Sequence, residues 1–149
     1  MKETLEILRA ELDTLRIRLV PLLDIPPPTK GWIATIRAAL GMPQHILAKR
    51  LSFSKQRVSQ LEAREETGDL TLTQMSEAAR ALDCKFVYAF IPIDPLTKTV
   101  QKRARAYARE QLAAVDRTMQ LEDQQTPIDE KRIDDYVRRH VTERDLWRS

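Results

Sequence analysis

Four polar side chains that can hydrogen-bond to base edges lie within six residues of one another, at Lys55, Gln56, Ser59 and Gln60. A glutamine amide pairs bidentately with adenine, and a lysine ammonium donates to the acceptors of guanine. The first two lie at the entry of an expected helix, and the other two lie about one turn further along. The pattern therefore predicts a helix that offers hydrogen-bonding groups to base edges in a DNA major groove.

A second set of side chains suits the DNA backbone rather than the bases. Between Leu40 and Arg64 the chain has five basic residues and one acidic residue, although its overall net charge is only +3. A local excess of positive charge is the expected footprint of a protein on phosphates. We therefore expect phosphate contacts from Gln44, Arg50, Ser54 and Arg57.

The elements that must position these side chains are two short helices joined by a tight polar turn. Pro43 suits the first position of the first helix, where a missing N–H costs nothing. Ser52-Phe53-Ser54 interrupts the helical pattern, and Ser54 is a good N-cap for the second helix. Two helices braced in this way form a helix-turn-helix. They can pack through one apolar face each, which contains Ile46, Leu47, Leu51, Val58 and Leu61.

This stretch resembles a known class of DNA-binding module. The spacing is similar to that of the phage-repressor (XRE) helix-turn-helix at Gln44, Ala48, Gln56, Val58, Ser59 and Glu62. A wider match from Gly31 to Ala108, which includes GWIATIRAALGM, LAKRLSFSKQRVSQLEAREETGDLTL and AARALDCKFVYAFIP, resembles the mobile mystery protein A family. The resemblance implies a lambda-repressor-like helical bundle and a structural role for Glu62. One departure is Ser52, where many repressors have glycine, the residue that enters left-handed conformations without cost.

The resemblance also implies a partner, because that family is encoded beside a protein with a Fic domain. The chain would then be the antitoxin of a toxin–antitoxin pair in the bacterial cytoplasm, associated with the nucleoid when bound to DNA. Helices that inhibit Fic proteins carry Ser or Thr four residues before Glu, followed by Gly or Asn. Thr118 and Glu122 have this spacing, but Asp123 follows them, so the match is incomplete.

The fold class expected from these patterns is mainly α, with one short strand after the helix-turn-helix bundle and additional helices at both ends. We expect an amphipathic helix in residues 1–24, a proline-rich linker in 25–30, the DNA-binding domain in 31–93 and a helical region in 94–149. Within the domain, a short helix is expected at Trp32–Leu40, with Trp32 and Leu40 facing inward and Arg37 free to reach a phosphate. A capping box formed by Thr71 and Gln74 predicts a further helix that ends near Leu82.

Two segments raise the question of a second copy. Leucines at positions 5, 8, 12, 15 and 19 follow a heptad pattern, which fits packing within the chain as well as a dimer or partner contact. Residues 85–91 read as a strand without a partner in a helical chain. Antiparallel pairing with a second copy across a two-fold axis would satisfy the backbone N–H and C=O groups of that strand. The paired residues would be Phe86, Val87, Tyr88, Ala89 and Phe90. Such a homodimer would place two recognition helices roughly 34 Å apart, which suits a palindromic operator.

Composition argues against several other functions. Cys84 is the only cysteine, so no disulfide forms within the chain, and we expect a packed thiol in a reducing compartment. His45 and His140 have no metal-ligand cluster near them in the sequence, and no cofactor or catalytic motif is evident, so we expect no enzyme. The charged residues 1–20 do not resemble a signal peptide, and no apolar run is long enough to cross a membrane. The basic face of the long C-terminal helix, Lys102, Arg103, Arg105 and Arg109, is read as a solvated surface.

Two functions remain open from the sequence. The first is a sequence-specific transcriptional repressor that binds its own operator as a dimer and serves as an antitoxin. The alternative is a protein-interaction module that neutralises a Fic-type toxin with little or no DNA binding.

Overall fold

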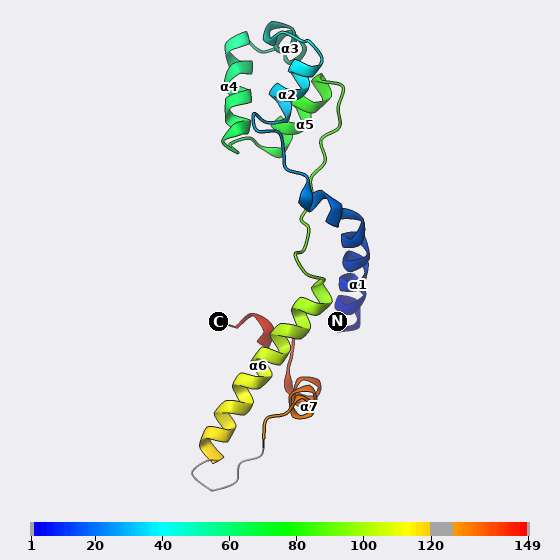
Figure 1. Ribbon diagram of the computed structural model, residues 1–149, viewed down its shortest axis with the longest axis vertical. Helices are drawn as coiled ribbons and strands as arrows, with labels where there is room; N and C mark the ends of the chain where they lie inside the picture. Colours follow the sequence, from blue (N-terminus) through cyan, green and yellow to red (C-terminus); the bar gives the residue numbers. More distant parts are fainter. Residues whose placement is uncertain (1, 120–126, 149) are drawn as a thin grey trace. The chain divides into compact units, whose positions relative to one another are not determined.

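The computed structural model describes residues 2–119 and 127–148, and these are mainly helical, as the sequence predicts. The chain divides into two compact units (Figure 1). One unit comprises residues 22–90, and the other combines the first 21 residues with residues 91–149. None of the described helices is both long and apolar enough to span a bilayer.

The unit formed by residues 22–90 is a bundle of four helices around one apolar core. Its helices are α2 (Trp32–Ala39), α3 (Gln44–Leu51), α4 (Lys55–Glu66) and α5 (Leu72–Ala81). The buried core residues are Ile33, Leu47, Ala48, Val58, Leu61, Ala78 and Leu82. The inward positions predicted for α3 and α4 are thus confirmed at Leu47, Val58 and Leu61, whereas Ile46 is exposed.

Two residues predicted to face the core of the bundle from α2 are exposed instead. Trp32 and Leu40 are about half exposed, and only Ile33 is buried. The helix is just over two turns long, and Ile33 and Ile36 already define its inward face. Trp32 is turned away from that face because it precedes Ile33 by one residue. Leu40 lies beyond the last helical residue, at the C-cap.

The turn between α3 and α4 is tight. Ser52 adopts the left-handed conformation, with φ 57° and ψ 40°. Ser54 caps α4, because its Oγ accepts a hydrogen bond from the backbone N–H of Arg57 at 3.1 Å. The predicted cap is therefore confirmed, and a serine occupies a conformation that glycine would adopt at lower cost.

The predicted capping box at the start of α5 is confirmed. The backbone N–H of Gln74 donates to the hydroxyl of Thr71 at 3.0 Å, and the backbone N–H of Thr71 donates to the side chain of Gln74 at 2.9 Å. The helix ends at Ala81, one residue before the predicted end. Asp83 then turns the chain with a positive φ of 58°.

The segment predicted to form a strand has no regular secondary structure in this single chain, and no strand occurs among the described residues. Its apolar side chains are open to solvent: Val87 is 71% exposed, Tyr88 69% and Phe90 97%. The rings of Phe86 and Tyr88 stack with their centroids 6.0 Å apart, as side chains two residues apart can in an extended backbone. The strand and its pairing between two copies remain predictions.

The unit that contains both chain ends is built on the long helix α6 (Leu96–Met119). Its small core joins Ala108 and Leu112 of α6 to Ile133 of α7. The other elements of this unit are α1 (Lys2–Leu19), α7 (Glu130–His140) and the short 3-10 helix η3 (Asp145–Trp147), while the 3-10 helix η1 (Val20–Asp24) follows α1.

The N-terminal helix contacts its own chain through polar residues, whereas Leu8, Leu12 and Leu15 of its leucine pattern are exposed, so the choice between packing and a dimer or partner contact stays open for that pattern. Asp13 of α1 caps the start of α6 by accepting hydrogen bonds from the backbone N–H of Leu96 at 2.6 Å and of Thr97 at 3.1 Å, and from the Thr97 hydroxyl at 2.7 Å. Burial raises the pKa of Asp13, but these hydrogen bonds outweigh it, so the pKa lies below its usual value of 3.8. The contact is polar, and no residue of α1 is buried.

Candidate nucleic-acid interface

The four side chains predicted to read bases lie together on the exposed side of α4. Lys55, Gln56, Ser59 and Gln60 are all exposed, while Val58 and Leu61 on the opposite side of the helix are buried. Positions four apart share a helix face, so Lys55 lies beside Ser59, and Gln56 lies beside Gln60. The first two turns of α4 thus present a continuous set of donors and acceptors to solvent.

Two of the predicted phosphate contacts lie at the start of α4. Ser54 uses its oxygen as an acceptor for the helix cap, but its hydroxyl proton can still be donated to a phosphate oxygen. The guanidinium of Arg57 lies over the ring of Phe53, 3.7 Å from the ring centroid. This cation–π contact holds the exposed Arg57 side chain beside the turn, where its N–H groups remain available.

The other two predicted phosphate contacts have partners in their own chain. Arg50 donates to the backbone carbonyl of Ala81 at 3.0 Å and lies 3.4 Å from the carboxylate of Asp83. Gln44 donates its side-chain N–H to Glu62 at 3.2 Å, which leaves its amide oxygen and the helix N-terminus outside this contact. Both residues therefore help to hold the bundle together, and their phosphate role stays a prediction.

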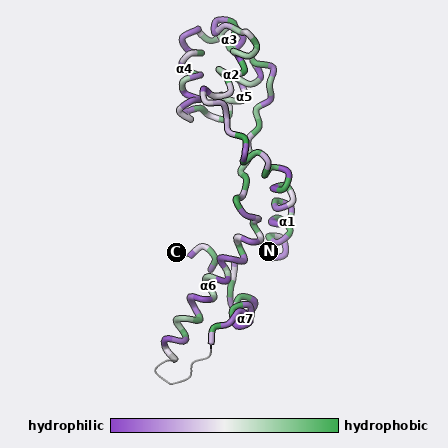
Figure 2. Tube along the Cα trace, in the orientation of Figure 1, coloured by the Kyte–Doolittle hydropathy of each residue, from purple (hydrophilic) through white to green (hydrophobic). Residues whose placement is uncertain are grey.

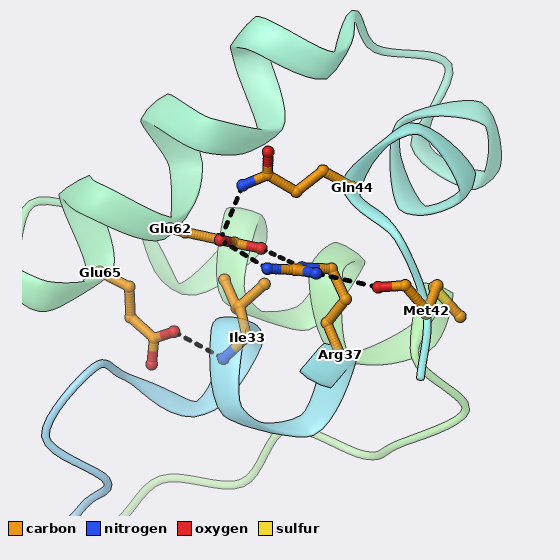
Figure 3. Close-up of polar contacts among 6 residues, drawn as sticks. All are labelled: Ile33, Arg37, Met42, Gln44, Glu62 and Glu65. Carbon is orange, nitrogen blue, oxygen red and sulfur yellow. Dashed lines mark hydrogen bonds and ion pairs between the residues drawn. The ribbon is translucent and has the colours of Figure 1, made fainter. Parts of the chain in front are cut away.

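Arg37 forms the centre of a polar network that joins α2 to α4 (Figure 3). It does not point outward to a phosphate, as the sequence suggested. Its Nε and Nη2 donate to the two carboxylate oxygens of Glu62 at 2.5 and 3.2 Å, and its Nη1 donates to the carbonyl of Met42 at 2.9 Å. Since Glu62 also accepts from Gln44, one carboxylate links α2, the start of α3 and α4. The interpretation of Glu62 as a structural residue is supported by these contacts.

A second glutamate of α4, Glu65, caps the first turn of α2, and this role was not predicted from the sequence. The carboxylate of Glu65 accepts from the backbone N–H of Trp32 and of Ile33, each at 2.8 Å. Gly31 precedes this turn with φ 85°, and a Cβ there would lie 2.7 Å from a Glu65 carboxylate oxygen. No local signal could reveal this cap, because the carboxylate is 32 and 33 residues away from the N–H groups that it binds.

The basic face of α6 is partly used by the protein itself. Arg105 pairs with Glu130 and Asp134 of α7, and Arg109 lies 3.6 Å from Glu130. Arg103 lies over the ring of Trp147, 4.4 Å from its centroid. These residues therefore connect the helices of their unit, rather than forming the purely solvated face that was expected.

Three other residues singled out from the sequence lie apart from α4 in the chain. Thr118 is exposed near the end of α6 and donates to the carbonyl of Ala114 at 3.2 Å, whereas Glu122 lies outside the described residues. Cys84 is exposed, not packed as expected, with its thiol 3.4 Å from the carbonyl of Leu82. It follows the end of the bundle, where the chain leaves the core.

Comparisons with protein-family models, curated proteins and solved structures give no match to this chain.

Proposed function

We propose that this chain is a sequence-specific DNA-binding repressor that acts as a homodimer on a palindromic operator. The observation that carries the proposal is the exposed row of Lys55, Gln56, Ser59 and Gln60 on a helix whose opposite side is buried. An exposed helix of this kind, braced by a second helix through a tight turn, fits the major groove. The base-reading role belongs to these four residues, and the phosphate-binding role belongs to Gln44, Arg50, Ser54 and Arg57.

The rigidity of the bundle supports this proposal. Glu62 and Glu65 lie on α4 itself and tie it to α2, so the direction of α4 is set by two carboxylates rather than by apolar packing alone. A recognition helix has to hold its side chains within a fraction of an ångström of the base edges, and rigid support of this kind lowers the cost of binding.

The dimer is proposed to form through residues 86–90, paired antiparallel with the same residues of a second copy. The exposed side chains of Val87, Tyr88 and Phe90 support this, since pairing would satisfy the backbone and cover apolar surface. As an antitoxin, the dimer would repress its own operon and bind a Fic-type toxin encoded beside it. This biological role rests on the sequence resemblance alone.

The deciding experiment is a binding titration with the DNA upstream of the gene, compared with a scrambled duplex of equal length. A repressor should prefer the upstream DNA and should lose affinity on the order of a thousandfold between about 50 and 200 mM salt. Equal affinity for both duplexes, or no binding, would remove the proposal. Co-purification with the neighbouring gene product without any binding to DNA would instead establish the alternative, an interaction module that neutralises a toxin.

A further inference from the structure

The helix α1 contacts its own unit through polar side chains, and the three central leucines of its heptad pattern stay exposed, while Leu5 and Leu19 are partly buried. Arg9 pairs with Glu143, Asp13 caps α6, and Arg16 donates to the backbone carbonyls of Pro92 and Ile93 at 2.7 Å each. Leu8, Leu12 and Leu15, by contrast, are 49, 39 and 42% exposed. Along α1, hydrophobic and hydrophilic residues alternate (Figure 2). An apolar seam of this length is normally covered in a folded protein.

The spacing of the seam indicates what covers it. Leucines recur at alternating intervals of three and four residues, which is the pattern of a helix that packs against a second helix with the same pattern. In the rest of this unit, the buried residues Ala108 and Leu112 of α6 already pack against Ile133 of α7. A second copy of α1 is therefore the matching surface that the protein itself provides.

We propose that the leucine seam of α1, formed by Leu5, Leu8, Leu12, Leu15 and Leu19, packs antiparallel against the same seam of a second copy. In this arrangement Leu12 lies against the partner's Leu15, and Leu8 lies against the partner's Leu19. The two-fold axis passes between the two symmetry-related contacts of Leu12 with Leu15, so every contact occurs twice. This inference adds a second contact to the dimer proposed above and rests on that dimer, not on DNA binding.

Charge favours the antiparallel direction. Glu11 and Arg18 flank the seam on one side, both are exposed, and neither has an ion-pair partner within the described residues. Antiparallel pairing puts Glu11 beside the partner's Arg18 twice, which gives two attractive pairs. A parallel pair would instead need Glu11 beside the partner's Arg16, whose guanidinium already donates to two backbone carbonyls of its own chain.

Neither contact would hold a dimer firmly alone. A helix pair of about two and a half heptads is short, and an isolated two-stranded pairing is marginal in water. Two weak contacts on one chain reinforce each other, because formation of the first makes the second intramolecular. The dimer should therefore respond to changes in α1 even though residues 86–90 are unaltered.

The test is the dimer dissociation constant of the full-length chain, measured by sedimentation equilibrium without DNA. Leu12→Glu places a charge in the seam and should weaken the dimer by a hundredfold or more. Ile17→Glu is the matched control, because Ile17 is also an apolar residue of α1, is 72% exposed and lies off the seam. It should leave the constant within about twofold. A wild-type chain that stays monomeric at 50 µM, or equal effects of the two variants, would overturn the proposal.

Charge reversal tests the direction of the pairing and does not depend on how Leu12→Glu folds. Glu11→Arg should weaken the dimer about tenfold, and the double variant Glu11→Arg/Arg18→Glu should restore it, since the two pairs are remade with opposite signs. A double variant as weak as the single one would overturn the antiparallel arrangement. This outcome can be told apart from a failure of the proposed function. Dimerisation through α1 without binding to an operator would support the α1 contact and refute the repressor function.

Discussion

The carboxylate of Glu62 accepts two hydrogen bonds from the guanidinium of Arg37, at 2.5 and 3.2 Å. Both side chains are largely covered, with 11 and 18% of their surface exposed. A covered, bidentate pair is worth more than a pair on an open surface, because water competes less for either partner. The pair joins the helix that carries the proposed base-reading residues to the first helix of the bundle.

Loss of one partner should therefore destabilise the bundle. Glu62→Gln removes the charge opposite Arg37 and should lower the free energy of unfolding by about 1–3 kcal/mol. The matched control is Arg64→Gln, whose pair with Asp69 is 3.5 Å long and exposed, so its effect should stay within about 0.5 kcal/mol. Urea unfolding followed by Trp32 fluorescence in a Trp147→Phe background reports on this unit. Equal changes for the two variants would contradict the role given to Glu62.

The two classes of DNA contact should separate by substitution. Gln56→Ala should cost about 1–3 kcal/mol on the operator and relax its sequence preference, because the amide is assigned to a base edge. Arg57→Ala should weaken operator and scrambled DNA alike and reduce the salt slope by about one, as expected for a phosphate contact. Fluorescence anisotropy with both duplexes at several salt concentrations measures both effects. Small, equal losses for the two variants would refute the assignment.

A substitution at Gly31 tests the carboxylate cap of α2. Gly31→Ala puts a methyl group 2.7 Å from the Glu65 carboxylate and also strains a backbone with φ 85°. Gly68→Ala is the control, because Gly68 has a similar φ of 76° but no atom within 4 Å of the added Cβ. The control should lose about 1–2 kcal/mol from backbone strain alone. Gly31→Ala should lose more in thermal or urea unfolding, and a loss no greater than the control would show that Glu65 is not held against α2.

The contact between α1 and α6 should depend on pH. Because the folded-state pKa of Asp13 is lowered, the carboxylate stabilises its unit above the unfolded value of 3.8, and this contribution disappears as the pH falls through the folded-state pKa. Asp13→Asn should cost about 1 kcal/mol at pH 7, as for the loss of a helix cap. The difference from wild type should shrink below pH 3.8. Trp147 fluorescence in a Trp32→Phe background measures it, and a difference that is constant from pH 7 to pH 3 would refute the role of Asp13.

Contacts between near neighbours in the chain could be predicted from the sequence. Ser54 caps the residue three positions ahead, and Thr71 and Gln74 cap each other across the same interval. The alternation of Val58 and Leu61 with polar residues likewise showed which side of α4 is buried. In each case helical geometry alone determines the neighbour.

Contacts between distant residues could not be predicted, because a single sequence does not show which charged residues pair in the folded protein. Arg37 was expected to face DNA and instead binds Glu62, 25 residues away. The role of Glu65 was missed for the same reason. For α1 the leucine pattern left packing and dimer contact open, and the attachment to α6 arises from Asp13, a polar residue beside the pattern. Trp32 and Leu40 were also misplaced, since in a helix of two turns the sequence pattern is too short to show which apolar residues face the core.

The hydrogen bonds from Leu96 and Thr97 to Asp13 span 83 and 84 residues of sequence. During synthesis the contiguous bundle of residues 22–90 leaves the ribosome before the residues of α6 that bind α1. Its helices can therefore assemble on the ribosome, whereas the N-terminal helix has to wait for the C-terminal third of the chain. Premature termination after the bundle would leave α1 without the helix that it caps, although every residue assigned to base reading would already be present.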